Sequence, residues 1–161
     1  MPKPKIKRIE LIYTEDKTRA VAELLEDEAP VTTKAMWDAL KVPMVTKGIH
    51  AMFCGREIML QMPHANQTPR LKRVPDENLT VYPSAGDLAW RYFGPHQERG
   101  FPDEIYDFMI FYGRECRLDL PMGIVPVNIF AVITEGLPEF AKRCERVRTE
   151  GLKEFMVRRL K

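Results

Sequence analysis

Hydrophobic and polar residues alternate with a period of two along much of this chain, which is the pattern of strands with one buried face. Residues 6–13 place Ile9 and Leu11 on one such face. The polar residues 14–17 then form a turn into a second strand over residues 18–25. Four further short strands are predicted over residues 48–53, 57–61, 88–92 and 153–160.

Residues 104–136 hold two apolar runs, separated by a more polar loop over residues 113–123. An apolar run of this length without alternation is typical of a strand that is buried on both faces. Such strands occur in closed or covered sheets, so this segment favours a closed sheet over an open one. The two runs bring the number of predicted strands to eight.

Two amphipathic helices are predicted between the strands. The first begins at Pro30, which fits the first turn of a helix, and runs to about Leu40. The second covers residues 137–151, where one apolar stripe includes Cys144. Eight strands enclose a barrel that side chains can just fill, and two helices can cover its ends. The 161 residues are therefore expected to form a single, mainly β domain, a closed eight-stranded barrel with two α-helices.

Two long segments interrupt this pattern. Residues 63–83 contain four prolines and a basic run, and residues 93–103 contain two prolines and His96. Long loops without secondary structure inside a domain are usually functional or mobile. Both segments are predicted to be irregular, and residues 63–83 are the best candidate for a contact between subunits. A homodimer is the commonest closed arrangement, so we expect one.

Composition narrows the function classes. The 25 basic and 23 acidic side chains leave a net charge of +2, which gives no reason to expect nucleic-acid binding. No apolar run approaches the roughly 20 residues that span a bilayer, and no signal peptide is recognisable, so no membrane partner is expected. Three widely spaced cysteines favour reduced thiols in the cytoplasm. Of these, Cys144 is expected in the core, whereas Arg56 could lower the pKa of Cys54.

Motifs spread over nearly the whole chain resemble one known family. They are Trp37-Asp38-Ala39-Leu40, Ile110-Phe111-Tyr112-Gly113 and Val127-Asn128-Ile129-Phe130-Ala131, with residues 22–30, 49–51, 82–87 and 135–136. Together they resemble the cyclophilin-like fold and, more closely, an uncharacterised prokaryotic family with that fold, the domain of unknown function 3830. The resemblance implies a fold and a family, but no activity.

Conventional cyclophilins are prolyl isomerases, and their catalytic strand has a Phe-His-Arg pattern followed by a Gln. By this resemblance Ile49-His50-Ala51 occupies that stretch, with Gln61 further on. Ala51 therefore falls where the catalytic Arg would be. The resemblance thus disfavours prolyl isomerase activity, because the main electrostatic element is missing. Arg56 is the nearest substitute, but it lies in a predicted turn.

Two side chains are candidates for catalysis. Glu104 adjoins a long loop that can overhang a cleft, where its carboxylate would be a pocket acid or base; the alternative is a strand-end charge in water. His50 would be a base or a hydrogen-bond donor; the favoured alternative is a histidine whose ring is satisfied in the core. Asp107 lies on the opposite strand face to Glu104 and is expected either in a pocket or paired with an Arg.

Five side chains are candidates for binding: Tyr112, Arg114, Asn128, Gln61 and Tyr106. Arg114 would hold a ligand carboxylate through two hydrogen bonds; the favoured alternative is a solvent-exposed arginine without a ligand. Asn128 interrupts an apolar strand, so its amide must be hydrogen-bonded, either to a neighbouring loop or to a ligand.

No metal site and no cofactor are expected. The three histidines are far apart in sequence, no Cys-x-x-Cys pair occurs, and neither a GxGxxG motif nor a P-loop is present.

The leading hypothesis is a small-molecule binding protein or enzyme of bacterial metabolism. Its pocket would lie beside residues 104–112, under the two long loops, and would take a small carboxylate or amide for hydrolysis or isomerisation. The alternative is a non-catalytic structural or interaction subunit, and prolyl isomerisation comes third.

Overall fold

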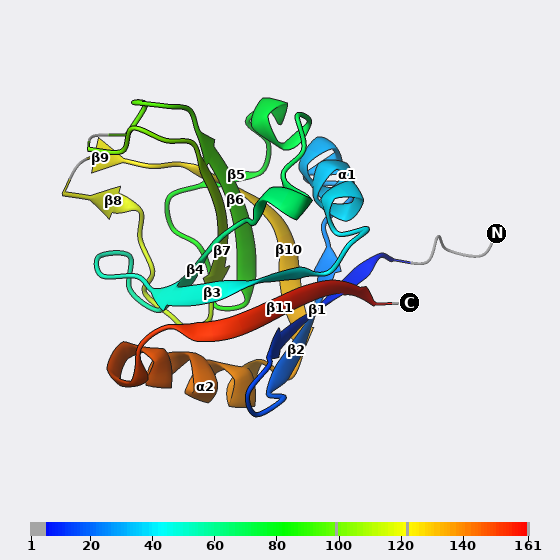
Figure 1. Ribbon diagram of the computed structural model, residues 1–161, viewed down its shortest axis with the longest axis vertical. Helices are drawn as coiled ribbons and strands as arrows, with labels where there is room; N and C mark the ends of the chain where they lie inside the picture. Colours follow the sequence, from blue (N-terminus) through cyan, green and yellow to red (C-terminus); the bar gives the residue numbers. More distant parts are fainter. Residues whose placement is uncertain (1–5, 99, 122, 161) are drawn as a thin grey trace.

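The sheet closes into a barrel because the two strands at its opposite edges pair with each other. The computed structural model describes residues 6–98, 100–121 and 123–160. The strand order is β2-β1-β11-β3-β4-β7-β6-β10, and β10 pairs in turn with β2. Each of these pairs is antiparallel (Figure 1). The bounds are β1 (Arg8–Tyr13), β2 (Arg19–Leu24), β3 (Met44–His50), β4 (Glu57–Gln61), β6 (Asp87–Phe93), β7 (Ile105–Phe111), β10 (Val127–Glu135) and β11 (Lys153–Leu160). The predicted eight-stranded barrel is confirmed.

The barrel interior is filled by the inward face of each strand. Ile58 and Leu60 of β4 and Phe108 and Ile110 of β7 belong to this core and are fully buried. Side chains that alternate with them point outward, since successive residues of a strand face opposite ways. The two faces of β4 and β7 therefore meet two different environments.

The outward face of β7 is buried as well, as the apolar run predicted. Met109 and Phe111 belong to a second, smaller core outside the barrel. A hairpin of two short strands, β8 (Asp119–Leu120) and β9 (Gly123–Ile124), stands off the barrel on this side (Figure 1). Leu118, which precedes the hairpin, packs into this second core.

Both predicted helices are present. In α1 (Pro30–Ala39) the core-facing residues include Met36, which is fully buried. In α2 (Leu137–Glu150) the apolar stripe contributes Phe140 and Cys144 to the barrel core, and the Phe140 ring lies 5.6 Å from the ring of Tyr13. Within the described ranges, no helix is long and apolar enough to cross a membrane.

The third strand lies earlier in the chain than predicted. β3 spans Met44–His50 rather than residues 48–53, and residues 51–56 form a loop in which Gly55 has a φ of 93°. Only Met44 and Gly48 are buried along β3, so its sequence carries no alternation that could locate it. A side chain at position 48 would press on Ile58, 3.0 Å away, which explains a glycine there.

Residues 63–83 are not structureless. They form two single 3-10 turns, η1 (His64–Asn66) and η2 (Leu71–Arg73), and a short strand β5 (Leu79–Thr80) beside β10. Long-range contacts that no local pattern reveals hold the segment in place. One of them is the indole N–H of Trp90, which donates to the Leu71 carbonyl.

Candidate functional site

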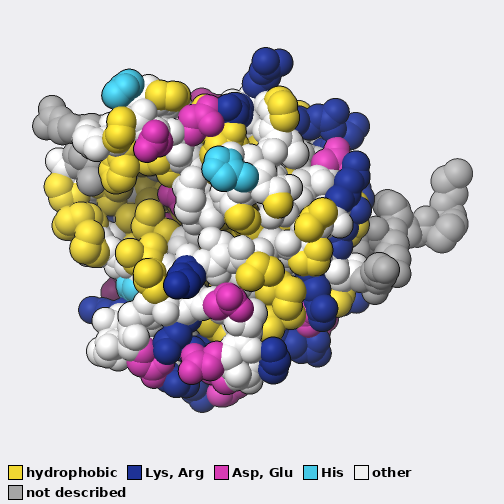
Figure 2. Space-filling model, viewed as in Figure 1, with side chains coloured by type: hydrophobic (Ala, Val, Ile, Leu, Met, Phe, Trp, Pro, Cys, Tyr) yellow, Lys and Arg dark blue, Asp and Glu magenta, His cyan; other side chains and the backbone are white. Residues whose placement is uncertain are grey.

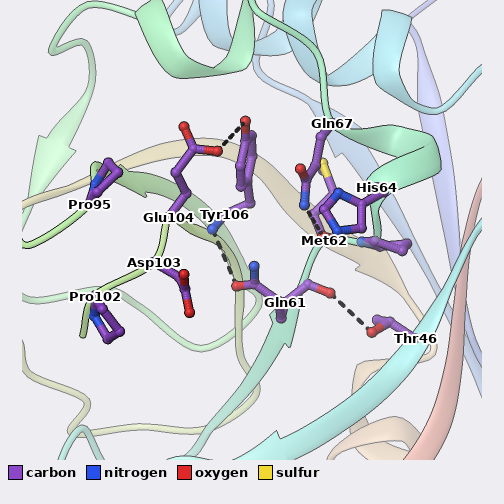
Figure 3. A pocket seen from close by; sticks show the side chains of 11 residues that line it. Thr46, Gln61, Met62, His64, Gln67, Pro95, Pro102, Asp103, Glu104 and Tyr106 are labelled. Carbon is purple, nitrogen blue, oxygen red and sulfur yellow. Dashed lines mark hydrogen bonds between the residues drawn. The ribbon is translucent and has the colours of Figure 1, made fainter. Parts of the chain in front are cut away.

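A cavity of about 610 Å³ opens at the end of the barrel where β4 ends and β7 begins, and we call it the mouth pocket (Figure 3). Both long loops contribute to its wall: His64 and Gln67 come from the first, and Pro95 and Pro102 from the second. The other lining residues are Thr46, Gln61, Met62, Pro63, Asp103, Glu104 and Tyr106. Three of the sequence candidates, Gln61, Glu104 and Tyr106, therefore meet in one pocket.

Glu104 is the best-anchored polar group of the mouth pocket. Its Oε1 accepts hydrogen bonds from the Lys72 ammonium and from the Tyr92 hydroxyl, the latter at 2.7 Å. Its Oε2 accepts only a long hydrogen bond of 3.5 Å from the Tyr106 hydroxyl (Figure 3). The bonds from Lys72 and Tyr92 lower the pKa of Glu104, so it is a carboxylate at neutral pH.

Gln61 is oriented by the backbone. Its Oε1 accepts the backbone N–H of Tyr106 at 3.2 Å, across the β4–β7 ladder (Figure 3). Because the oxygen of this amide is engaged, its NH₂ end is the end that a ligand can meet. Gln61 thus offers donors, and Glu104 offers an acceptor, in the same pocket.

His50 and Tyr112 lie together, but far from Glu104. The strand advances about 3.3 Å per residue, and Tyr112 lies eight positions after Glu104, so roughly 20 Å or more separates them. The Tyr112 hydroxyl is 2.6 Å from His50 Nε2 and donates to Glu145 of α2 at 2.8 Å. His50 lines a separate hollow between the end of β3 and α2. The two catalytic candidates, Glu104 and His50, therefore lie in different pockets and cannot act on one small ligand.

Arg114 lines a third hollow, an open groove beside α2 that also includes Tyr112. Arg56 borders the same groove, with its Nε 3.7 Å from the Glu145 carboxylate. Ala51 is buried in the second core, so the position that the resemblance assigns to a catalytic arginine holds a packed methyl group.

Asn128 belongs to the barrel wall and not to a large pocket. Its side-chain amide donates to the Thr32 hydroxyl at 3.0 Å and to the Pro75 carbonyl at 2.8 Å. These bonds connect β10 to α1 and to the 63–83 segment. Of the two alternatives for the Asn128 amide, a neighbouring loop or a ligand, the structure has the bond to the loop.

Sequence reasoning missed one cavity. It lies over the outward face of β4 and β7, has a volume of about 140 Å³, and is called the outer-face pocket below. Its lining residues are Cys54, Glu57, Met59, Arg91, Phe93, Glu98, Phe101, Ile105, Asp107, Met109, Leu118, Leu120 and Val125. Figure 2 shows hydrophobic side chains gathered on the side of the molecule where β8 and β9 lie.

The chemistry of Cys54 is also different from the prediction. The residue is buried, and burial together with the nearby Glu57 charge raises the pKa of its thiol above the ordinary value. The neighbouring Arg56, which the sequence offered only as a group that could lower this pKa, lies instead with its Nε 3.7 Å from the Glu145 carboxylate. Cys54 is therefore a thiol at neutral pH and a poor nucleophile.

Comparison with known proteins places the chain in a family. A model of the family described as "Protein of unknown function (DUF3830)" matches residues 12–158, and the chain belongs to that family. No curated protein matches the chain.

Solved structures with a similar fold include proteins of several kinds. McbB, solved in complex with tryptophan, superposes with a TM-score of 0.65 at 16% identity; the match covers 93% of this chain but only 44% of McbB. A hypothetical protein of Archaeoglobus fulgidus, AF2241, gives 0.53 at 21% identity, over 99% of this chain and all of its own. The Mimivirus cyclophilin gives 0.56 at 14% identity, over 98% and 90%. The fold is therefore cyclophilin-like, as the sequence motifs implied.

Proposed function

We propose that this protein binds a small amide in the mouth pocket. The observation that carries the proposal is the pairing of Glu104 and Gln61 in one cavity. The weakly engaged Oε2 of Glu104 is placed to accept an N–H from a ligand, and the NH₂ of Gln61 is placed to donate to its carbonyl. McbB, part of which has a similar fold, was solved in complex with tryptophan, which supports a small-molecule ligand for this chain.

An amide fits the charges of the mouth pocket better than a carboxylate does. Asp103 and Glu104 both line it, and the nearest ammonium, that of Lys72, already pairs with Glu104. An added carboxylate would therefore meet two like charges in the pocket wall.

Within this proposal Glu104 is also the group that can act on a bound amide. An ionised carboxylate can take a proton from a water or from the ligand, as a general base does in hydrolysis or isomerisation. The lowered pKa of Glu104 disfavours the opposite role of general acid at neutral pH.

Thermal-shift measurements test the proposal, because a ligand that binds only the folded state raises the melting temperature. We expect small amides such as propionamide and benzamide to raise it more than the matching carboxylates do. Glu104→Gln should abolish the shift, whereas Glu154→Gln, a change at an exposed residue of β11, should keep it.

The alternative function, a structural or interaction subunit, predicts a different result. None of the amides would shift the melting temperature. Light scattering would instead report a stable dimer in which residues 63–83 are protected from protease. That combination would replace small-molecule binding with subunit contact as the role of the two long loops.

A further inference from the structure

Glu57 is a buried carboxylate without a matching donor for one of its oxygens. The residue is 1% exposed, and its Oε2 has no hydrogen-bond partner among the residues that the structure describes. Glu57 lines the outer-face pocket. Buried polar atoms are almost always satisfied, so an unpaired one that lines a cavity calls for an explanation.

A second carboxylate lines the same cavity from the next strand. In the β4–β7 ladder, Glu57 lies opposite Phe111, and Asp107 lies opposite Gln61. The two carboxylates therefore enter the outer-face pocket from different ends of the ladder, with Met59 and Met109 between them. Apolar side chains form most of the cavity wall, and Cys54, Arg91 and Glu98 line it as well.

No cation forms an ion pair with either carboxylate within residues 6–98, 100–121 and 123–160, although Arg91 lines the same cavity and its buried Nε has no hydrogen-bond partner in that part of the chain. Arg91 lies directly across the ladder from Asp107, but its Nη1 is turned toward Asp76, at 3.5 Å. Of the two alternatives for Asp107, a pocket or an ion pair with an arginine, the ion pair is not formed in this part of the chain, and Asp107 lines a pocket. Burial raises the pKa of Glu57 to about 7, and burial together with the Glu57 charge raises the pKa of Asp107.

The free-energy cost of burying these carboxylates without partners indicates that they have a function. An unpaired ionised carboxylate in an apolar site is destabilising, and proteins retain such groups mainly where they bind or react. The ligand that relieves the cost must bring a positive charge or a strong N–H donor to Glu57. Its body must be apolar to pack against Met59, Met109 and Leu118.

We propose that the outer-face pocket binds a small aliphatic ammonium ion, with its nitrogen at Glu57 and its hydrocarbon body between the two methionines. The volume of about 140 Å³ sets the size. A cavity of roughly 150 Å³ holds a molecule as large as benzene, so a ligand of about six non-hydrogen atoms fits. This site is separate from the mouth pocket, with which it shares no lining residue, and it does not depend on the function proposed there.

Isoamylamine and isoamyl alcohol form a matched pair of probes, because they have the same shape and differ in charge. Calorimetric titration at pH 8 should show that the wild-type protein binds the amine and binds the alcohol about tenfold more weakly or not at all. Glu57→Gln, which keeps the shape of the side chain, should weaken amine binding by about 10- to 100-fold. Asp107→Asn should weaken it less. Glu139→Gln, a change at an exposed residue of α2, should leave it unchanged.

The pH dependence supplies an independent readout. An ammonium ion binds the ionised form of Glu57, so affinity should fall by roughly tenfold or more between pH 8 and pH 5.5. At pH 6 binding should release close to one proton, measured by titration in buffers with different heats of ionisation. Alcohol binding should show neither effect.

Three results would overturn the proposal: no amine binding by the wild-type protein, equal affinity for amine and alcohol, or unchanged affinity in Glu57→Gln. Circular dichroism of each variant checks that it is folded. Since Asp107→Asn probes the same cavity from its other end, the proposal stays testable even where one variant is unstable. Glu104→Gln, the variant for the mouth pocket, lies outside this cavity, so the two proposals can fail separately.

Discussion

Glu10 and Glu57 are equally buried, at 1% exposure each, but among the described residues only Glu10 of the two has ion-pair partners. Glu10 accepts hydrogen bonds from Arg19 at 2.5 Å and from Arg158 at 2.7 Å. Glu57 has one oxygen without any partner in the described part of the chain. Burial alone would raise both pKa values; the two arginines reverse this for Glu10, whose pKa is lowered, whereas that of Glu57 rises to about 7. The two carboxylates should therefore affect stability in opposite ways.

The Glu57 carboxyl should make the protein less stable as the pH rises. Its pKa is about 7 in the folded state and near 4.5 in the unfolded state, so between these values the folded state holds one more proton. The free energy of unfolding then falls with rising pH across this window, by about 3 kcal/mol in total. Urea unfolding from pH 4.5 to pH 8 should show a smaller fall in Glu57→Gln, which should be the more stable protein at pH 8. A wild-type curve that is no steeper than that of the variant would contradict the raised pKa.

Glu10→Gln should have the opposite effect at neutral pH. It leaves two arginines without their carboxylate, but both side chains reach solvent, so we expect a loss of about 2 kcal/mol rather than the larger cost of a fully buried pair. Because the folded-state pKa of Glu10 is lowered, its stabilising effect is present above pH 4.5 and is lost as the pH falls through the folded-state value. Urea unfolding at pH 7 and pH 3 measures both. A loss at pH 3 as large as that at pH 7 would count against the ion pairs.

Asn128→Ala should loosen the 63–83 segment. The substitution removes a buried amide and leaves the Pro75 carbonyl and the Thr32 hydroxyl without this donor, at a cost of about 1–3 kcal/mol. Limited trypsin digestion should then cut faster at Arg70, Lys72 and Arg73. Gln97→Ala, which removes an exposed amide from the other long loop, is the matched control and should not change that rate. An unchanged cutting rate in Asn128→Ala would show that other contacts hold the segment.

Tyr112→Phe should raise the pKa of Glu145. The hydroxyl of Tyr112 is the largest of the influences that lower this pKa, and the same hydroxyl contacts His50. Loss of the hydroxyl of this buried tyrosine should also reduce the free energy of unfolding by about 1 kcal/mol. Carboxyl NMR titration measures the first effect, and urea unfolding the second. Tyr82→Phe, at an exposed tyrosine, should change neither; a Glu145 pKa that stays lowered in Tyr112→Phe would assign the effect to Arg148 and Arg56 instead.

Much of the fold follows from local patterns in the chain. Period-two alternation placed β1 and β2, unbroken apolar runs identified β7 and β10 as strands buried on both faces, and the stripe through Cys144 identified α2. The sequence reveals these elements because each pattern depends only on residues that are close to one another in the chain. The exception, β3, has only two buried residues and no alternation, and its predicted position was wrong.

The candidate sites depended on contacts between distant residues. Gln61, Glu104 and Tyr106 were proposed as site residues from their types, and the tertiary structure brought them into one pocket. It also brought His50 of β3 against Tyr112, with His50 Nε2 2.6 Å from the Tyr112 hydroxyl, at the end of β7 opposite Glu104. Asn128 proved to anchor a loop, a role that requires knowing what lies beside β10.

The burial of Glu57 could not be predicted from the sequence. In the string Gly55-Arg56-Glu57-Ile58 it looks like a charged residue beside a turn, and nothing local distinguishes it from an exposed one. The sequence determined that this chain forms a barrel of the cyclophilin-like kind, since hydrophobic periodicity is a property of neighbouring residues. Only the tertiary structure decided that Glu57 and Asp107 face one apolar cavity, because a carboxylate is buried or solvated by what the rest of the chain packs over it.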